Sequence, residues 1–269
     1  MRDMLSNPEY EPFFYRAVEP SIFEPSVRCV GPWNPNHQHG GPAIALLGQC
    51  FDTYPRQGDR FVSRMAVEIL GPIYLESMSV TISVVRSGVR IELLEGFVTQ
   101  GERAVLRGLC WRFRVGNSVA IPFDEEPTFF SLPTDESLVK FPSATTVPYI
   151  ESMEWRFVLG SFDVAGNAVL WSRPRVPLVY ERPTSQVAKA LLMLDSANGA
   201  SSVLSFNSDL FVPVDMTLSV LRVPEGAWMG MEAKTTIGEH GSGITKTVLF
   251  DEHGHVGNTL QTLFVESKH

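Results

Sequence analysis

The stretch Pro183–Gly199, PTSQVAKALLMLDSANG, decides the fold. Its apolar residues recur three and four positions apart and cover most of a helical surface, which predicts one long helix. Thr184 or Ser185 can cap the start of this helix, and Asn198-Gly199 supply its end. A helix that is apolar nearly all round is normally buried inside the molecule.

Asp195 stands at the C-terminal end of this predicted helix. The helix dipole and the apolar surroundings both disfavour the charged form of a carboxylate at this place. That is the environment in which a general base works near neutral pH. Two interpretations therefore remain open from the stretch alone: a general base, or a solvated aspartate in the turn after the helix.

Composition limits the classes of function. The 269 residues are 44% hydrophobic and 19% charged, which is typical of a globular protein, and the formal net charge is −8. An acidic balance argues against a nucleic-acid-binding surface. Cys29, Cys50 and Cys110 form no C-x-x-C pair and fit a reducing, cytoplasmic environment. No apolar run indicates a signal peptide or a membrane span.

A second helix is predicted from Gly40-Gly41-Pro42, since proline is tolerated in the first turn and the following apolar residues keep helical spacing. Gly40 and Gly41 are candidate substrate-binding residues, because bare backbone N–H groups at a helix start can hold an anion or a carbonyl oxygen. The alternative is a tight turn in which glycine serves only packing.

The order of elements predicts an α+β fold. After the first helix, residues 61–115 read as strands of an antiparallel meander, with no alternation of strand and helix. The second half repeats helix and strands, and a proline-rich stretch lies between. We therefore expect an N-terminal module at 1–118, a connector at 119–149 and a C-terminal module at 150–269. This order resembles the double hotdog fold, in which each of two tandem modules wraps a curved antiparallel sheet around a long central helix. Two sheets joined edge to edge also remove exposed strand edges.

Three stretches resemble the acyl-CoA thioesterases of the double-hotdog thioesterase II and thioesterase-like group. They are HGGPAIALL at 39–47, LDSANG at 194–199, and the closing strands at 215–267, above all LFDEHGHVGNTLQTLFV. The resemblance implies hydrolysis of an acyl-CoA to a free acid and coenzyme A, in fatty acid metabolism. It implies no metal and no cofactor, with coenzyme A present only as part of the substrate. It also leaves open a homo-oligomer.

In that group an aspartate, a threonine and a glutamine hold the attacking water. By resemblance Asp195 is the aspartate and Gln261 the glutamine, while the position of the threonine holds Pro213, which has no hydroxyl. Either the two remaining residues suffice, or Asn198 or Ser201 fills in, or the activity is weak or lost. Asn198 is for this reason a candidate substrate-binding residue.

Other interpretations stay open beside hydrolysis. One is a non-catalytic protein that binds acyl groups or acyl-CoA. Another is a hotdog enoyl-CoA hydratase, whose motif Asn34-Pro35 and His37 resemble, although Pro32 replaces its aspartate and His39 departs from it as well.

Further candidate sites are weaker. The histidine pairs, His37 with His39 and His253 with His255, lack a third metal ligand nearby. Ser242 lacks the context of a nucleophile elbow. Four arginines have the geometry to meet phosphates, and the alternative for each is a solvated charge: Arg86, Arg90, Arg173 and Arg175.

Overall fold

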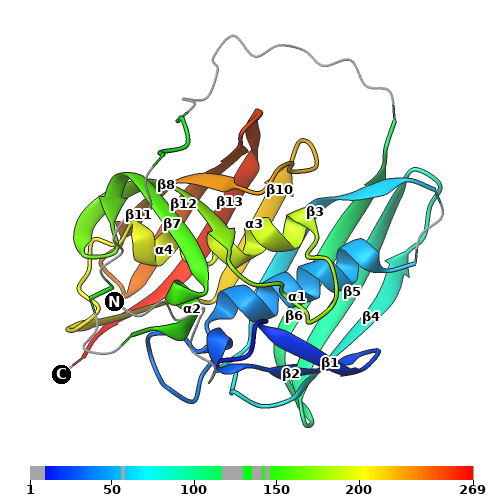
Figure 1. Ribbon diagram of the computed structural model, residues 1–269, viewed down its shortest axis with the longest axis horizontal. Coiled ribbons are helices and arrows are strands. Elements are labelled where there is room, and N and C mark those ends of the chain that lie inside the picture. Colours follow the sequence, from blue (N-terminus) through cyan, green and yellow to red (C-terminus); the bar gives the residue numbers. More distant parts are fainter. Residues whose placement is uncertain (1–9, 56–57, 117–129, 135–140, 143–145, 269) are drawn as a thin grey trace.

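The strands of the computed structural model form one large antiparallel sheet with two helices side by side against one face (Figure 1). The structure describes residues 10–55, 58–116, 130–134, 141–142 and 146–268. Most of the connector expected at 119–149 therefore lies outside the described residues. Among the described helices, none is long and apolar enough to cross a membrane.

The N-terminal half begins with two short strands. A long helix and four antiparallel strands follow, and the sequence predicted this helix and a run of strands at 61–115. The elements are β1 (Tyr15–Glu19), β2 (Ile22–Pro25), the 3-10 turn η2 (Val27–Cys29), α1 (Gly40–Thr53), β3 (Arg60–Ile69), β4 (Met78–Arg86), β5 (Ile91–Gln100) and β6 (Arg103–Arg114). Helix α1 is buried along most of its length, which explains why its sequence is apolar on nearly every side.

The C-terminal half repeats this plan. Its elements are α2 (Pro148–Glu151), β7 (Met153–Ser161), β8 (Val164–Pro174), α3 (Gln186–Leu194), α4 (Ala197–Ala200), β9 (Asp209–Pro213), β10 (Asp215–Val220), β11 (Met229–Ile237), β12 (Ser242–Asp251) and β13 (Gly254–Ser267). The sequence did not predict strand β9, which pairs with the end of β13.

The two halves join edge to edge where β3 pairs with β10, with Met216 opposite Val67. The strand order is β1-β2-β4-β5-β6-β3-β10-β13-β12-β11-β8-β7. Helices α1 and α3 pack against each other; at Gly48 an added Cβ would lie 2.2 Å from the Leu191 side chain, so only glycine permits this approach. The arrangement is a double hotdog, as the sequence predicted.

The helix predicted at 183–199 is in fact two helices. Ser185 caps α3, since its Oγ accepts a hydrogen bond from the Ala188 N–H, but α3 ends at Leu194. The Tyr149 hydroxyl donates to the Leu192 carbonyl, which the Ser196 N–H would take in a continued helix. The Ser196 N–H bonds Met193 instead. The helix therefore breaks at Asp195, before the predicted end at Asn198-Gly199, and the carboxylate lies at the break.

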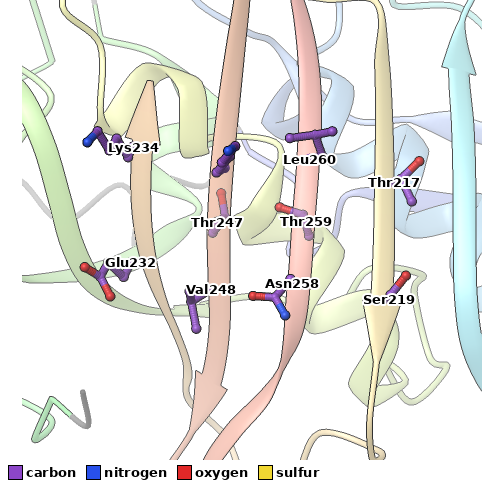
Figure 2. Close-up of a pocket in the computed structure, with 10 residues that line it drawn as sticks. Thr217, Ser219, Glu232, Lys234, Thr247, Val248, Asn258, Thr259 and Leu260 are labelled. Carbon is purple, nitrogen blue, oxygen red and sulfur yellow. The ribbon is translucent and has the colours of Figure 1, made fainter. Parts of the chain in front are cut away.

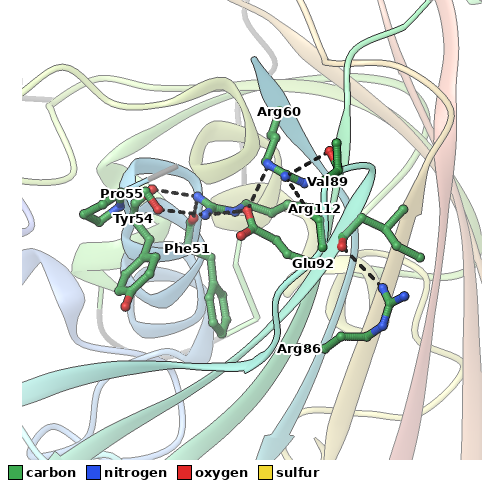
Figure 3. A network of polar contacts seen from close by, with 10 residues as sticks. Phe51, Tyr54, Pro55, Arg60, Arg86, Val89, Glu92 and Arg112 are labelled. Carbon is green, nitrogen blue, oxygen red and sulfur yellow. Dashed lines mark hydrogen bonds and ion pairs between the residues drawn. The ribbon is translucent and has the colours of Figure 1, made fainter. Parts of the chain in front are cut away.

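A buried arginine network ties the end of α1 to the sheet (Figure 3). Arg112 of β6 is fully buried and donates to the Glu92 carboxylate at 2.8 Å. It also donates to the backbone carbonyls of Phe51, Tyr54 and Pro55 at 2.7–3.2 Å. Arg112 thus satisfies carbonyls that the end of the helix leaves without partners.

Replacing Arg112 by methionine is expected to lower the free energy of unfolding by about 3–5 kcal/mol, because it leaves Glu92 and the helix carbonyls buried without this partner. The matched control is Arg107→Met on the same strand. Arg107 is half exposed and pairs with Glu95, so its loss should cost about 1 kcal/mol or less. Urea unfolding measures both variants; equal losses would contradict this role of the network.

Candidate functional site

The break after α3 brings Asp195 to the start of α1. Asp195 is 3% exposed, and its Oδ2 lies 3.0 Å from Nδ1 of His39, the residue that caps α1. An added Cβ at Gly40 would lie 2.8 Å from the same oxygen. The carboxylate is therefore at the C-terminal end of α3, whose dipole disfavours its negative charge. It is also at the N-terminal end of α1, whose dipole favours that charge. The helix start at Gly40 was predicted, but nothing in the sequence indicated that it lies beside Asp195.

His39 makes two contacts through one nitrogen. Its Nδ1 lies 3.0 Å from Asp195 Oδ2 and 3.1 Å from the Gly41 N–H. An imidazole nitrogen either accepts a hydrogen bond or donates one, so the two contacts exclude each other. If Asp195 is ionised and Nδ1 carries no proton, two acceptors, Oδ2 and Nδ1, face each other at 3.0 Å. A proton on Nδ1 turns this contact into a hydrogen bond to Asp195. The Gly41 N–H is then released from its cap.

Tyr149 fixes the plane of the His39 ring. The two rings are stacked, with centroids 3.9 Å apart and planes 11° from parallel. The Tyr149 hydroxyl bonds the Leu192 carbonyl and, at 2.9 Å, Ser196 Oγ. Burial raises the pKa of Tyr149 far above its ordinary value, so the phenol stays neutral and keeps donating. A rigid aromatic wall thus holds the histidine against the aspartate.

Gln261 reaches the same place from β13. It is fully buried, and its Nε2 donates to the Asp195 backbone carbonyl at 3.5 Å. Gln261 Oε1 and Asp195 Oδ1 are both buried and have no hydrogen-bond partner among the described residues. The structure therefore brings together the two residues that the sequence proposed, from two elements 66 positions apart.

The two unpartnered atoms are both acceptors. A water molecule carries two O–H donors, so one water within reach of both Oδ1 of Asp195 and Oε1 of Gln261 would satisfy both. Leaving both unsatisfied would cost about 1–3 kcal/mol each. Such a water would keep its lone pairs free to attack an electrophile. The arrangement suits the activation of water beside a carboxylate that accepts its proton.

Gly40→Ala is expected to lower kcat/KM about 10- to 100-fold, because the new Cβ would displace the Asp195 carboxylate it crowds. The control is Gly71→Ala, whose Cβ would meet only the flexible end of Arg103, at 3.3 Å. Kinetics and thermal unfolding of both variants check this. Full activity in Gly40→Ala would show that the position of the carboxylate does not matter.

The other candidates from the sequence have structural partners. The Gly41 N–H has His39 Nδ1 as a partner at 3.1 Å, so it is bare, as the sequence suggested, only when that nitrogen donates to Asp195. Asn198 Nδ2 donates to the Phe211 carbonyl at 3.3 Å and so ties α4 to β9. Ser201 Oγ bonds the Ala197 carbonyl and Thr235. Pro213 pairs with Leu263 at the end of β9. Asn198 and Ser201 thus have hydrogen bonds that do not involve Asp195.

Sequence reasoning missed His39 and Tyr149. His39 stood next to the helix start but was weighed only as part of a hydratase motif and of a metal-binding pair with His37, and Tyr149 stood at the end of the connector without any motif. His37, the histidine of that motif, has its ring against Tyr74 instead.

Cys50 and Cys110 are poorly suited to act as nucleophiles, and the histidine candidates lack a set of metal ligands among the described residues. Burial raises the pKa of Cys50 to about 11 and that of Cys110 to about 12, so neither is a thiolate at neutral pH. His253 is exposed near the β12–β13 turn, 3.7 Å from Glu225. Within the described ranges, no three His, Cys, Asp or Glu side chains are placed to share a metal ion.

Two of the arginines considered for phosphate binding already bond other groups of the protein. Arg173 pairs with Glu154 at 2.7 Å, and Arg86 donates to the Ile91 carbonyl at 3.3 Å.

Known structures share this fold over nearly the whole chain. A conserved hotdog protein of unknown function from Alicyclobacillus acidocaldarius has 16% identity and a TM-score of 0.72, with 94% of this chain and 95% of that chain covered. The tesB protein of Mycobacterium avium subs paratuberculosis has 14% identity and a TM-score of 0.67, with the same coverage. The acyl-CoA thioesterase II TesB2 of Mycobacterium marinum has 12% identity and a TM-score of 0.67, again with 94% and 95% covered. At these identities the likeness shows the fold alone.

Sequence comparison gives the family. No curated protein matches the chain. The family model of the acyl-CoA thioesterase N-terminal domain matches residues 30–113, and that of the C-terminal domain matches residues 132–265. Between them they cover both halves of the double hotdog and the stretches that carry His39, Asp195 and Gln261. The chain therefore belongs to the acyl-CoA thioesterase family.

Proposed function

We propose that the protein hydrolyses an acyl-CoA thioester, using a water held between Asp195 and Gln261. The observation that carries the proposal is the pair of buried acceptors, Asp195 Oδ1 and Gln261 Oε1, without partners among the described residues. The family adds the substrate class, because its members are acyl-CoA thioesterases. Hydrolysis needs an oriented water, a proton acceptor and a donor for the developing oxyanion.

Each step of the proposed hydrolysis can be assigned to a residue of the site. Asp195 takes a proton from the water as the water oxygen bonds the thioester carbon. His39, held by Tyr149, keeps the carboxylate in place from its other oxygen. When Nδ1 of His39 donates to Asp195, the Gly41 N–H is released and is a donor for the oxyanion. The carbon–sulfur bond then breaks, and the proton leaves on the thiol of coenzyme A.

The same histidine and aspartate favour a second candidate, the addition of water to an enoyl-CoA. The hydratase motif lacked its aspartate because Pro32 stands there, but the fold supplies Asp195 beside His39. A neighbouring histidine and carboxylate form an acid–base pair for that reaction. Here the expected histidine is His39 and no longer His37.

A panel of saturated and enoyl-CoA esters tests these functions together. Release of free thiol from saturated acyl-CoAs supports hydrolysis. Consumption of the enoyl group without thiol release, lost in His39→Ala, would favour hydration. Tight binding with neither reaction would indicate a non-catalytic acyl-CoA-binding protein and would contradict the proposal.

A further inference from the structure

The two halves contain the same hairpin, and this permits a position-by-position comparison. In β5–β6 the turn is closed by Gln100 opposite Arg103, and in β12–β13 by Asp251 opposite Gly254. Each hairpin has a bulge after the next pair of residues. Beyond the bulge, the third pair is Gly96–Gly108 in the first hairpin and Thr247–Thr259 in the second. Both pairs lie on the sheet face toward the helices.

In the first hairpin this place is apolar and filled. An added Cβ on Gly96 would lie 2.8 Å from Phe51 and 2.9 Å from Leu47, both on α1. An added Cβ on Gly108 would lie 2.8 Å from Leu47. The glycines therefore serve close packing of the helix on the sheet, and the position itself does not require polar residues.

In the second hairpin the same place is polar. Thr247 and Thr259, the threonine pair, are 3% and 4% exposed, and neither hydroxyl has a hydrogen-bond partner among the described residues. A buried hydroxyl without a partner costs about 1–3 kcal/mol, which valine, of the same shape, would avoid. Their nearest strand neighbours on this face are mixed in polarity: Thr245 and Leu249 on β12, and Gly257 and Gln261 on β13. The Thr245 hydroxyl bonds Thr235 at 2.8 Å, whereas the hydroxyls of the threonine pair have no such partner among the described residues.

The threonine pair continues the candidate site. Thr259 precedes Gln261 by two residues on β13, so the two side chains share a face about 6.6–6.8 Å apart along the strand. Gln261 Oε1 also lacks a partner. A short run of carbon atoms spans that distance from a thioester carbon that the water at Gln261 would attack.

The outer face of the sheet is a different surface. A hollow of about 530 Å³ lies there, bordered by exposed side chains such as Glu232, Lys234 and Leu260 (Figure 2). The threonine pair, on neighbouring strands in Figure 2, also borders this hollow. Strand alternation and near-complete burial nevertheless place both threonine side chains on the helix side.

We propose that the threonine pair binds a hydroxyl or carbonyl group on the acyl chain, so that oxygenated acyl-CoAs are the preferred substrates. The inference rests on the proposed function, because the water held at Gln261 fixes where the thioester carbon must lie. A threonine hydroxyl both donates and accepts, so either group completes it. A site built to bond a polar substrate group rejects the analogue that lacks it, since its own polar groups then stay unpaired.

The test compares kcat/KM for acyl-CoAs of equal length, with no hydroxyl or with one at carbon 3, 4 or 5. At one position the wild type should favour the hydroxylated substrate by about tenfold or more. Thr247→Val and Thr259→Val should lose this preference, and Thr259→Ser should keep it. Thr236→Val, at an exposed position on β11, is the control. Urea unfolding should show the valine variants at least as stable as the wild type, which separates substrate binding from folding.

No preference at any position, or a preference that survives in both valine variants, would overturn the inference. If no thioester releases thiol, the proposed function fails separately. Calorimetric binding of the same substrate pairs then decides the inference: tighter binding of a hydroxylated acyl-CoA, lost in Thr259→Val, would uphold it, and equal binding would end it.

Discussion

Asp195→Asn is expected to lower kcat for acyl-CoA hydrolysis by about 10²- to 10⁴-fold, the usual contribution of a positioned general base. The amide keeps the shape of the side chain but cannot take the proton of the water. KM should change little, because the carboxylate acts on water rather than on coenzyme A. Release of free thiol under saturating substrate measures the effect.

The control for this variant is Asp163→Asn, the same change at an exposed position near the β7–β8 turn. It should match the wild type in kcat and in stability. Unfolding of Asp195→Asn must also be followed, because His39 loses an ionised partner. A folded Asp195→Asn protein with kcat within about threefold of the wild type would remove Asp195 from the chemistry.

Gln261→Leu is expected to lower kcat by about 10²- to 10³-fold, comparable to the loss of one preorganised hydrogen-bonding group in an active site. The water would keep Asp195 as acceptor but lose the group that fixes its direction. Asn258→Leu, on the outer face of the same strand, is the matched change of an amide to an apolar side chain and should leave kcat unchanged.

The same variant has a second expected outcome. Gln261 is fully buried. Leucine removes its Oε1, which has no partner among the described residues, and loses only the long hydrogen bond of 3.5 Å from Nε2 to the Asp195 carbonyl. Gln261→Leu should therefore be as stable as the wild type or more stable, although it is less active. A variant that loses stability and activity in parallel would indicate that Gln261 serves the fold and not the reaction.

Much of the fold was predictable because the residues that a helix or strand buries recur at a fixed spacing along the sequence. The apolar spacing of both helices and the strand-rich segments between turns led to the double hotdog. The length of the second helix was not predictable. It ends at Leu194 because the Tyr149 hydroxyl takes the Leu192 carbonyl, and that contact spans 43 positions. The residues next to Leu194 in the sequence do not indicate a partner so far along the chain.

The candidate site was predictable only in part. Resemblance pointed to Asp195 and Gln261, and the structure places them in contact. It did not point to His39 as the partner of Asp195, because that contact joins the start of α1 to the end of α3. Asn198 and Ser201, proposed in place of the missing threonine at Pro213, instead bond Phe211 and Thr235. Spacing along the chain does not tell which hydrogen bonds a buried polar group already has.

A double-mutant cycle tests most directly whether Asp195 and Gln261 act on the same water. We measure kcat for the wild type, Asp195→Asn, Gln261→Leu and the combined variant. Residues that act as one unit are not additive, so the combined variant should be no slower than Asp195→Asn by more than about threefold. A combined loss equal to the product of the two separate losses would show that the two side chains act independently.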